Sequence, residues 1–317
     1  MNNCDAYYVF AKTLKAEGAS LEGLFGLRGT GSKLLETITS FRNTLRSIQI
    51  QLQADLHGDT TIATVVEALR HCPMLINLDI SGHNPVRLDQ VLQRLRNLKK
   101  LTITLMEEVS VTETYGTYFR HPLCELDVKA YNIDDDVFQY LSQCCRSITS
   151  LSCEFECPQR QLITIYYPHA CLRHLTVITY GGRSFALFKV TLERGTKHVQ
   201  RGNIYVGKEK RGEMIENYSH WYKYGDHKFC EVSSLQHLPV EELLKNIRGP
   251  GDKLDILEAM TGKELLDAGI CNHLVLIRCP YIDSMNLNRF KVSEFVGDTT
   301  GKISRLSTQW SPVKNYY

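Results

Sequence analysis

The sequence has no long hydrophobic run and few cysteines. Its longest apolar stretches, such as residues 274–277, are far shorter than the roughly 20 apolar residues that span a bilayer. Residues 1–5 show no basic region leading into an apolar one, so we expect no signal peptide. With 11 cysteines in 317 residues, the chain is well below the density of a disulfide-stabilised scaffold. We therefore expect a protein of a reducing compartment, the cytoplasm or the nucleus, without a membrane partner.

An excess of charge of one sign is also missing. The 37 basic and 35 acidic side chains leave a formal net charge of +2. Such a balance argues against a surface-wide field that would attract nucleic acid or anionic lipid. Hydrophobic residues make up 43% and charged residues 23%, as in an ordinary soluble globular protein.

Sequence motifs of catalysis and cofactor binding are absent. The chain contains no G-x-S-x-G, no H-E-x-x-H and no dinucleotide-binding fingerprint. The glycine-rich residues 26–33 resemble a phosphate loop only superficially, because Ser32 separates Gly31 from Lys33. We expect a helix before this stretch and interpret it as a helix–helix turn. The sequence thus predicts a protein that is not an enzyme, with no catalytic residues and no cofactor.

What the sequence does contain is a repeat. The pattern L-x-x-L-x-L starts at Leu45, Leu75, Leu98, Leu123, Ile148 and Leu172, at intervals of 30, 23, 25, 25 and 24 residues. All but the first interval match the 20–29-residue period of leucine-rich repeats. Between these strand-like phrases the apolar period changes from 2 to 3.6, as in the helical stripe of Ile62, Val65, Val66 and Leu69. The pattern predicts an α/β fold, a leucine-rich-repeat horseshoe with a parallel concave sheet and outer helices.

Several phrases carry a cysteine at one fixed position. The template C-x-x-Φ-x-x-Φ-x-Φ, in which Φ is apolar, fits the sequence from Cys72, from Cys145 and from Cys271. Residues 68–80 and 141–151 resemble the cysteine-containing leucine-rich repeats of F-box proteins, including the many fungal ones. The resemblance covers residues 45–180 well and 250–282 less well. It implies that the strand face of the repeats faces a protein substrate, and that a separate F-box helix bundle binds ubiquitin-ligase components.

The F-box itself is not recognisable. Residues 1–44 lack its opening motif, and the nearest match, residues 238–247, follows the main array. We divide the chain into an N-terminal helical cap (1–44), leucine-rich repeats (45–180), an irregular aromatic and basic insertion (181–234), further repeats (235–282) and a C-terminal cap or tail (283–317). Within the insertion, the β-prone runs 185–192 and 198–206 predict a hairpin.

Two groups of residues could suggest metal binding. Cysteine and histidine cluster at Cys153, Cys157, His169, Cys171 and His174, but Cys153 and His174 should point to opposite faces of the sheet. Three adjacent acids, residues 134–136, are explained by capping of a helix start. We therefore predict no metal, and cysteines that are reduced and buried like small apolar side chains at Cys72, Cys145, Cys153, Cys271 and Cys279.

The candidate binding surface follows from strand alternation. The residues on either side of the second leucine of each phrase should leave the core and line the exposed face of the sheet. From these we predict a protein-binding site formed by Asn77, Asp79, Lys100, Glu125, Asp127 and His174, with Trp221 and Tyr222 as anchors. The predicted function is a non-enzymatic protein–protein interaction module, the substrate-recognition part of an F-box-type adaptor. The alternative is nucleic-acid binding through the basic, aromatic segment 185–230, which a steep salt dependence would reveal.

Overall fold

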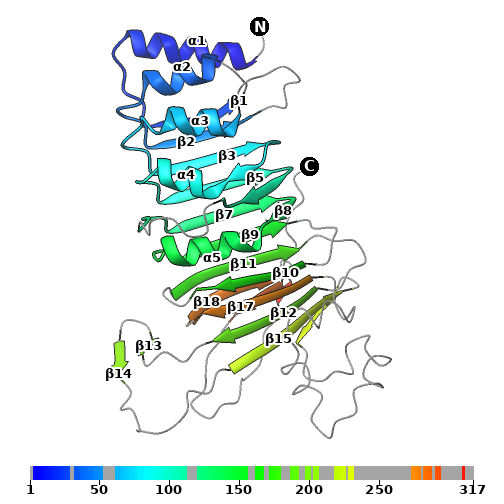
Figure 1. Cartoon of the computed structure of the whole chain (residues 1–317). Coiled ribbons are helices and arrows are strands. Elements are labelled where there is room, and N and C mark those ends of the chain that lie inside the picture. Colours follow the sequence, from blue (N-terminus) through cyan, green and yellow to red (C-terminus); the bar gives the residue numbers. More distant parts are fainter. Residues whose placement is uncertain are drawn as a thin grey trace, which may run out of the picture. The chain divides into compact units, whose positions relative to one another are not determined.

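The chain forms two compact units, an N-terminal unit of Met1–Phe155 and a C-terminal unit of Glu156–Tyr317. The structure, a computed structural model, is drawn with its helices and strands labelled in Figure 1. It describes residues 3–28, 32–52, 61–112, 120–155, 161–167, 171–179, 186–192, 197–200, 203–206, 218–225, 228–231, 273–279, 281–287, 290–293 and 309–310. No helix of this described part is long and apolar enough to cross a membrane.

The N-terminal unit is built on a parallel sheet. Its strands are β1 (Gly23–Arg28), β2 (Ser47–Gln51), β3 (Asn77–Gly82), β5 (Lys100–Leu105), β7 (Glu125–Ala130) and β9 (Ser150–Phe155), which neighbour one another in that order. The helices are α1 (Asn3–Ala16), α2 (Ser32–Ser40), α3 (Ile62–Leu69), α4 (Leu88–Arg94) and α5 (Asp135–Cys144). Three short strands, β4 (Val86–Arg87), β6 (Glu108–Ser110) and β8 (Asn132–Ile133), form a small second sheet. The predicted α/β class and the predicted parallel strands are therefore confirmed.

One row of apolar side chains runs straight through this sheet. Ile48, Leu78, Leu101, Leu126 and Leu151 are register partners across five strands, and none is more than 2% exposed. A second buried row, two residues further along each strand, ends at Cys153. The second apolar residue of each phrase is thus buried, as its place in the repeat predicts, and Leu175 in the C-terminal unit is also buried.

The N-terminal stretch contains a strand as well as the two expected helices. Leu24 and Leu27 of β1 are buried, but the register shifts between them, where Gly26 adopts a φ of +70°. This irregularity breaks the simple alternation and hides the strand from pattern analysis. The element that precedes the glycine-rich stretch is thus a strand, and the predicted helix–helix turn is wrong; residues 29–31 lie outside the described part.

The C-terminal unit joins strands that are far apart in the sequence. One group runs β11 (Cys171–Thr179), β18 (Tyr281–Leu287), β19 (Phe290–Ser293) and β20 (Gln309–Trp310). A five-stranded sheet has the order β10 (Gln161–Tyr166), β17 (His273–Cys279), β12 (Ala186–Leu192), β15 (Tyr218–Gly225) and β16 (Lys228–Glu231). β13 (Lys197–Gln200) and β14 (Asn203–Val206) form a separate pair.

Pairing in the C-terminal unit differs from the sequence prediction. β12 pairs antiparallel with β15 and parallel with β17, and not with the run at 198–206. That run folds back on itself as the β13–β14 hairpin. β17 carries the phrase around Leu274 and pairs with β10 as well as β12. The F-box-like residues 238–247 and Cys271 lie outside the described part.

The cysteine prediction is confirmed where it can be followed. Cys72, Cys145, Cys153 and Cys279 are buried free thiols. Burial raises the pKa of the Cys72 thiol to about 11 and raises the pKa of Cys145 and Cys153 further. Among the described residues, no group of His, Cys, Asp and Glu could hold a metal ion. Cys157 and His169 lie outside the described part.

Candidate protein-binding face

The exposed side of the parallel sheet in the N-terminal unit carries polar side chains in three rows. We call this the polar face. Its first row is Ser47, Asn77, Lys100, Glu125 and Ser150; its second is Gln49, Asp79, Thr102, Asp127 and Ser152; its third is Gln51, Ser81, Thr104, Lys129 and Glu154. Each row consists of direct register partners, so neighbouring side chains of a row stand about 4.8 Å apart. The rows alternate with the buried apolar rows, which the pleat sends to the opposite side.

Hydrogen bonds order the polar face at the β2 end. The Asn77 Nδ2 donates to Ser47 Oγ at 2.9 Å, within the first row. The Gln49 Nε2 donates to Asp79 Oδ2 at 2.9 Å, within the second row, and Gln49 Oε1 accepts from the backbone N–H of Gly26 at 3.3 Å. These cross-strand bonds hold the side chains in defined positions and reduce the entropy that a partner would have to remove on binding.

Ion pairs cross the polar face between β5 and β9. Lys100 Nζ lies 2.9 Å from Glu125 Oε2, with both side chains about half exposed. Lys129 Nζ lies 2.9 Å from Glu154 Oε2. The Glu125 carboxylate raises the pKa of Lys100, with smaller contributions from Asp127 and Asp79. Lys100 is thus one cation among three carboxylates.

Asp127 occupies the middle of this arrangement. Its Oδ1 is covered by neighbouring atoms and has no hydrogen-bond partner. Its register partners in the second row, Thr102 and Ser152, carry only neutral hydroxyls. A buried carboxylate oxygen without a donor is costly to leave unpaired.

The structure brings together five of the predicted binding residues. Asn77, Asp79, Lys100, Glu125 and Asp127 occupy adjacent strands of the polar face. His174 belongs to β11 in the C-terminal unit.

The two predicted anchors lie in another sheet. Trp221 and Tyr222 are in β15, opposite Lys189 and Phe188 of β12, whereas His174 is in a strand that pairs with β18. Their grouping with the polar face stays a prediction.

Sequence reasoning missed two kinds of residue. Ser81 and Thr104 extend the third row, because β3 and β5 continue beyond the L-x-x-L-x-L phrase that defined the expected strand. Ser284 was also missed, although its Oγ lies 2.7 Å from His174 Nδ1. It comes from a strand 110 residues away, and no local signal links the two positions.

The polar face is rich in groups that can form hydrogen bonds with a partner. It combines carboxylates, two lysines, amides and hydroxyls on rigid strands, all of them hydrogen-bonding groups that can fix a partner's orientation. Acids outnumber lysines on this face, which is the opposite of a phosphate-binding groove.

No protein-family profile, no curated protein and no solved structure matches this chain.

Proposed function

We propose that the chain is a leucine-rich-repeat solenoid whose polar face binds a protein partner. In this proposal it is a non-enzymatic interaction module of the cytoplasm or nucleus, acting as the substrate-recognition part of an F-box-type ubiquitin-ligase adaptor. The observation that carries the proposal is the set of three polar rows, held in register over β2 to β9.

The solenoid interpretation is supported by the way each repeat attaches to the one before it. The backbone N–H groups of Ile76 and Asn77 both donate to Arg46 O, at 2.9 and 3.0 Å. Those of Lys99 and Lys100 donate to Ile76 O at 2.8 and 3.0 Å. Each of the strands β3, β5, β7 and β9 also neighbours the strand of the preceding repeat. Contacts restricted to nearest neighbours are what defines a solenoid.

The binding interpretation is supported by the regular grid of the polar face. Strands about 4.8 Å apart and side chains about 6.7 Å apart along each strand let one partner touch several repeats at once. The rows from β2 to β9 span about 19 Å, which corresponds to roughly six residues of an extended chain. An extended segment therefore fits the described part of this face.

The charge of the polar face indicates the kind of segment that it would bind. Asp79 and Asp127 flank Thr102 in the second row. Lys100, a cation close enough to interact with both, is already paired with Glu125. A segment with lysine or arginine side chains spaced to reach these two carboxylates would make charge-assisted hydrogen bonds with them.

Quantitative capture from a cell lysate tests the proposal. We would compare the native protein with Asp127→Lys and with a control, Glu36→Lys, which reverses an exposed charge on α2 whose pairing with Lys12 spans 3.5 Å. Exposed pairs of this kind contribute little to stability. We expect a set of proteins that the native chain and the control both retain and that Asp127→Lys loses. Equal capture by all three proteins would contradict binding through the polar face.

Salt dependence separates this proposal from nucleic-acid binding through residues 185–230. Phosphate contacts release counterions, so affinity would fall by several orders of magnitude between 50 and 200 mM salt. A mixed polar protein interface should lose much less. A steep loss, together with retention of binding in Asp127→Lys, would favour the nucleic-acid alternative.

A further inference from the structure

The connection into β1, residues 17–22, contains Glu17 and Glu22, but the described residues that directly precede β2, β3, β5, β7 and β9 contain no acid. They are residues 41–46, 70–76, 95–99, 120–124 and 145–149. Their basic side chains, all exposed, are Arg42, Arg46, Arg70, Arg96, Lys99, Arg120 and Arg146. We call this set the basic edge.

These connections form one continuous border of the sheet. The strands are parallel and in register, so their first residues meet at the same edge. Backbone hydrogen bonds tie each connection to the next: the N–H of Lys99 donates to Ile76 O, that of Cys124 to Lys99 O and that of Thr149 to Cys124 O, all between 2.8 and 2.9 Å. The basic side chains are therefore spaced by the repeat itself, about 4.8 Å from strand to strand.

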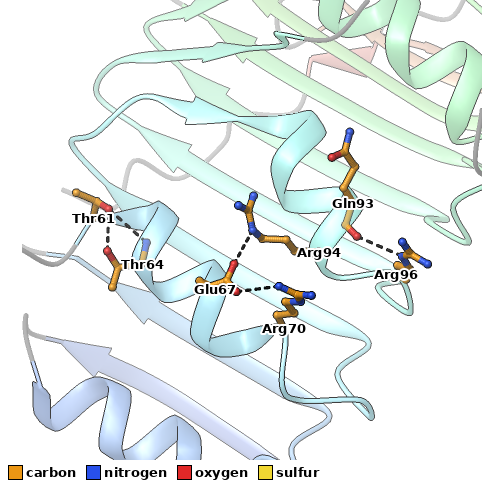
Figure 2. Close-up of polar contacts among 7 residues, drawn as sticks. All are labelled: Thr61, Thr64, Glu67, Arg70, Gln93, Arg94 and Arg96. Carbon is orange, nitrogen blue, oxygen red and sulfur yellow. Dashed lines mark hydrogen bonds and ion pairs between the residues drawn. The ribbon is translucent and has the colours of Figure 1, made fainter. Parts of the chain in front are cut away.

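Two carboxylates near this edge, Glu67 and Glu22, are already paired. Glu67 lies between two arginines (Figure 2), with Oε2 2.7 Å from Arg94 Nε and Oε1 3.1 Å from Arg70 Nη1. Glu22 faces Arg46 at 3.7 Å. Hydrogen bonds from Arg94 and then Arg70 lower the pKa of Glu67, so this carboxylate stays ionised and committed to them.

Most of the basic edge has no such partner. Arg42, Lys99, Arg120 and Arg146 form no ion pair with any other residue of the described part. Arg96 donates from Nε to the backbone oxygen of Gln93 at 3.4 Å, as Figure 2 shows.

The opposite border of the sheet is mainly acidic. In its described residues, 83–87, 106–112 and 131–134, the charged residues other than histidine are Arg87, Glu107, Glu108 and Asp134. Helix dipoles favour acids at helix starts and bases at helix ends, but that effect is confined to the terminal turn. Lys99 and Arg146 lie in the connections beyond the helix ends. The basic edge is therefore more than helix capping.

We propose that the basic edge binds an extended acidic segment of a partner protein. Arginine presents a planar fork that pairs bidentately with carboxylates. An edge of about 19 Å corresponds to roughly six residues of extended chain. Phe41, the one Phe, Tyr or Trp in the connections that form the basic edge, is buried. The described residues of the edge thus offer no exposed ring for stacking on bases, as single-stranded nucleic acid requires, so we favour a polypeptide.

The test uses a fluorescein-labelled peptide of alternating glutamate and serine, about twelve residues long so that it exceeds the edge. The edge variant combines Arg42→Glu, Lys99→Glu, Arg120→Glu and Arg146→Glu, which disrupts none of the ion pairs above. The control combines Lys12→Glu, Arg28→Glu, Lys33→Glu and Arg87→Glu, exposed basic residues outside the basic edge. Both variants change the net charge equally. Peptide anisotropy and thermal melting are measured on all three proteins.

We expect the native protein and the control to bind the peptide within about threefold of each other, and the edge variant to bind about thirtyfold more weakly, at unchanged melting temperature. If the edge variant melts early, the milder pair Arg120→Gln and Arg146→Gln should still lose about fivefold. No binding by the native protein, or an equal loss in both variants, would overturn the proposal. So would tighter binding of a DNA duplex or of oligo-dT than of the peptide, with loss of that binding in the edge variant.

Discussion

The two units of the molecule build their sheets in different ways. In the N-terminal unit, β2, β3, β5, β7 and β9 pair in chain order, each with the strand of the adjacent repeat. In the C-terminal unit, β17 inserts between β10 and β12, and β18 pairs with β11 from more than 100 residues away. Strands that follow one another in the repeat sequence therefore pair with one another in the N-terminal unit but not in the C-terminal unit. A periodic sequence can specify the first kind of sheet but not the second.

The largest expected effect on stability comes from truncating one leucine of the buried apolar row in the N-terminal unit. Leu151 is 1% exposed and pairs in register with Leu126. Leu151→Ala should lower the free energy of unfolding by about 2–5 kcal/mol, because it removes apolar burial and leaves a cavity. Urea denaturation measures this loss. Ser152→Ala, on the polar face, is the matched control and should change stability by less than about 0.5 kcal/mol. Equal losses of the free energy of unfolding in Leu151→Ala and Ser152→Ala would refute the assigned register.

A comparable change in the C-terminal unit should spread to two strands at once. Ile277, buried in β17, lies in register with Ile165 of β10 and Val190 of β12. Ile277→Ala should therefore speed amide hydrogen exchange in 161–166 and in 186–192 together.

Its counterpart in the N-terminal unit is Leu24→Ala in the terminal strand β1, which pairs with β2. In a stacked array the damage should stay with the nearest neighbour, so faster exchange should be confined to 23–28 and 47–51. If exchange also became faster as far away as β7, the expected difference between the two units would be absent.

A buried histidine gives the next largest effect. His121 is 2% exposed; its Nδ1 accepts from the N–H of Leu123 at 3.2 Å, so its Nε2 donates to Leu95 O at 2.9 Å. Removing the ring in His121→Ala leaves Leu95 O without this donor and should cost about 1–3 kcal/mol in urea denaturation.

Burial also makes His121 a source of pH dependence. Desolvation lowers the pKa of the folded imidazole below its ordinary value, so the unfolded chain binds the proton first as the pH falls. The stabilisation is complete above the unfolded-state pKa of about 6.5 and is lost as the pH decreases from there towards the folded pKa. Urea denaturation at pH 7 and pH 5 should show a smaller decrease in His121→Gln than in the native protein. If the free energy of unfolding decreases as much in His121→Gln as in the native protein, groups other than His121 cause the pH dependence.

The smallest expected effect concerns the thiols. Cys72 and Cys145 are buried, and burial raises the pKa of both, whereas Cys124 is partly exposed. A thiol reagent at neutral pH should modify Cys124 before Cys72 and Cys145, and it should reach those two only on unfolding. Mass-spectrometric mapping of labelled sites gives the order. Rapid labelling of Cys145 in the native state would contradict its buried position.

What could be predicted from the sequence follows the same division. The spacing of Leu75, Leu98 and Leu123 determined the parallel strands and the polar face, because each repeat needs only its neighbour. β1 escaped prediction because the irregularity at Gly26 interrupts its alternation. The partners of β17 and the contact between His174 and Ser284 depend on chain segments far apart in sequence. No local pattern encodes such pairings.

The most direct test of the central claim is the affinity of a captured partner for three single variants. Asp127→Lys changes the middle of the polar face, Trp221→Ala changes the predicted anchor in β15, and Glu36→Lys changes the surface of α2. Calorimetric titration should show Asp127→Lys and Trp221→Ala each weakening binding by about tenfold or more, with Glu36→Lys unchanged and all three proteins folded. Unchanged affinity in the first two, with binding abolished by Glu36→Lys, would place the partner elsewhere and contradict the claim.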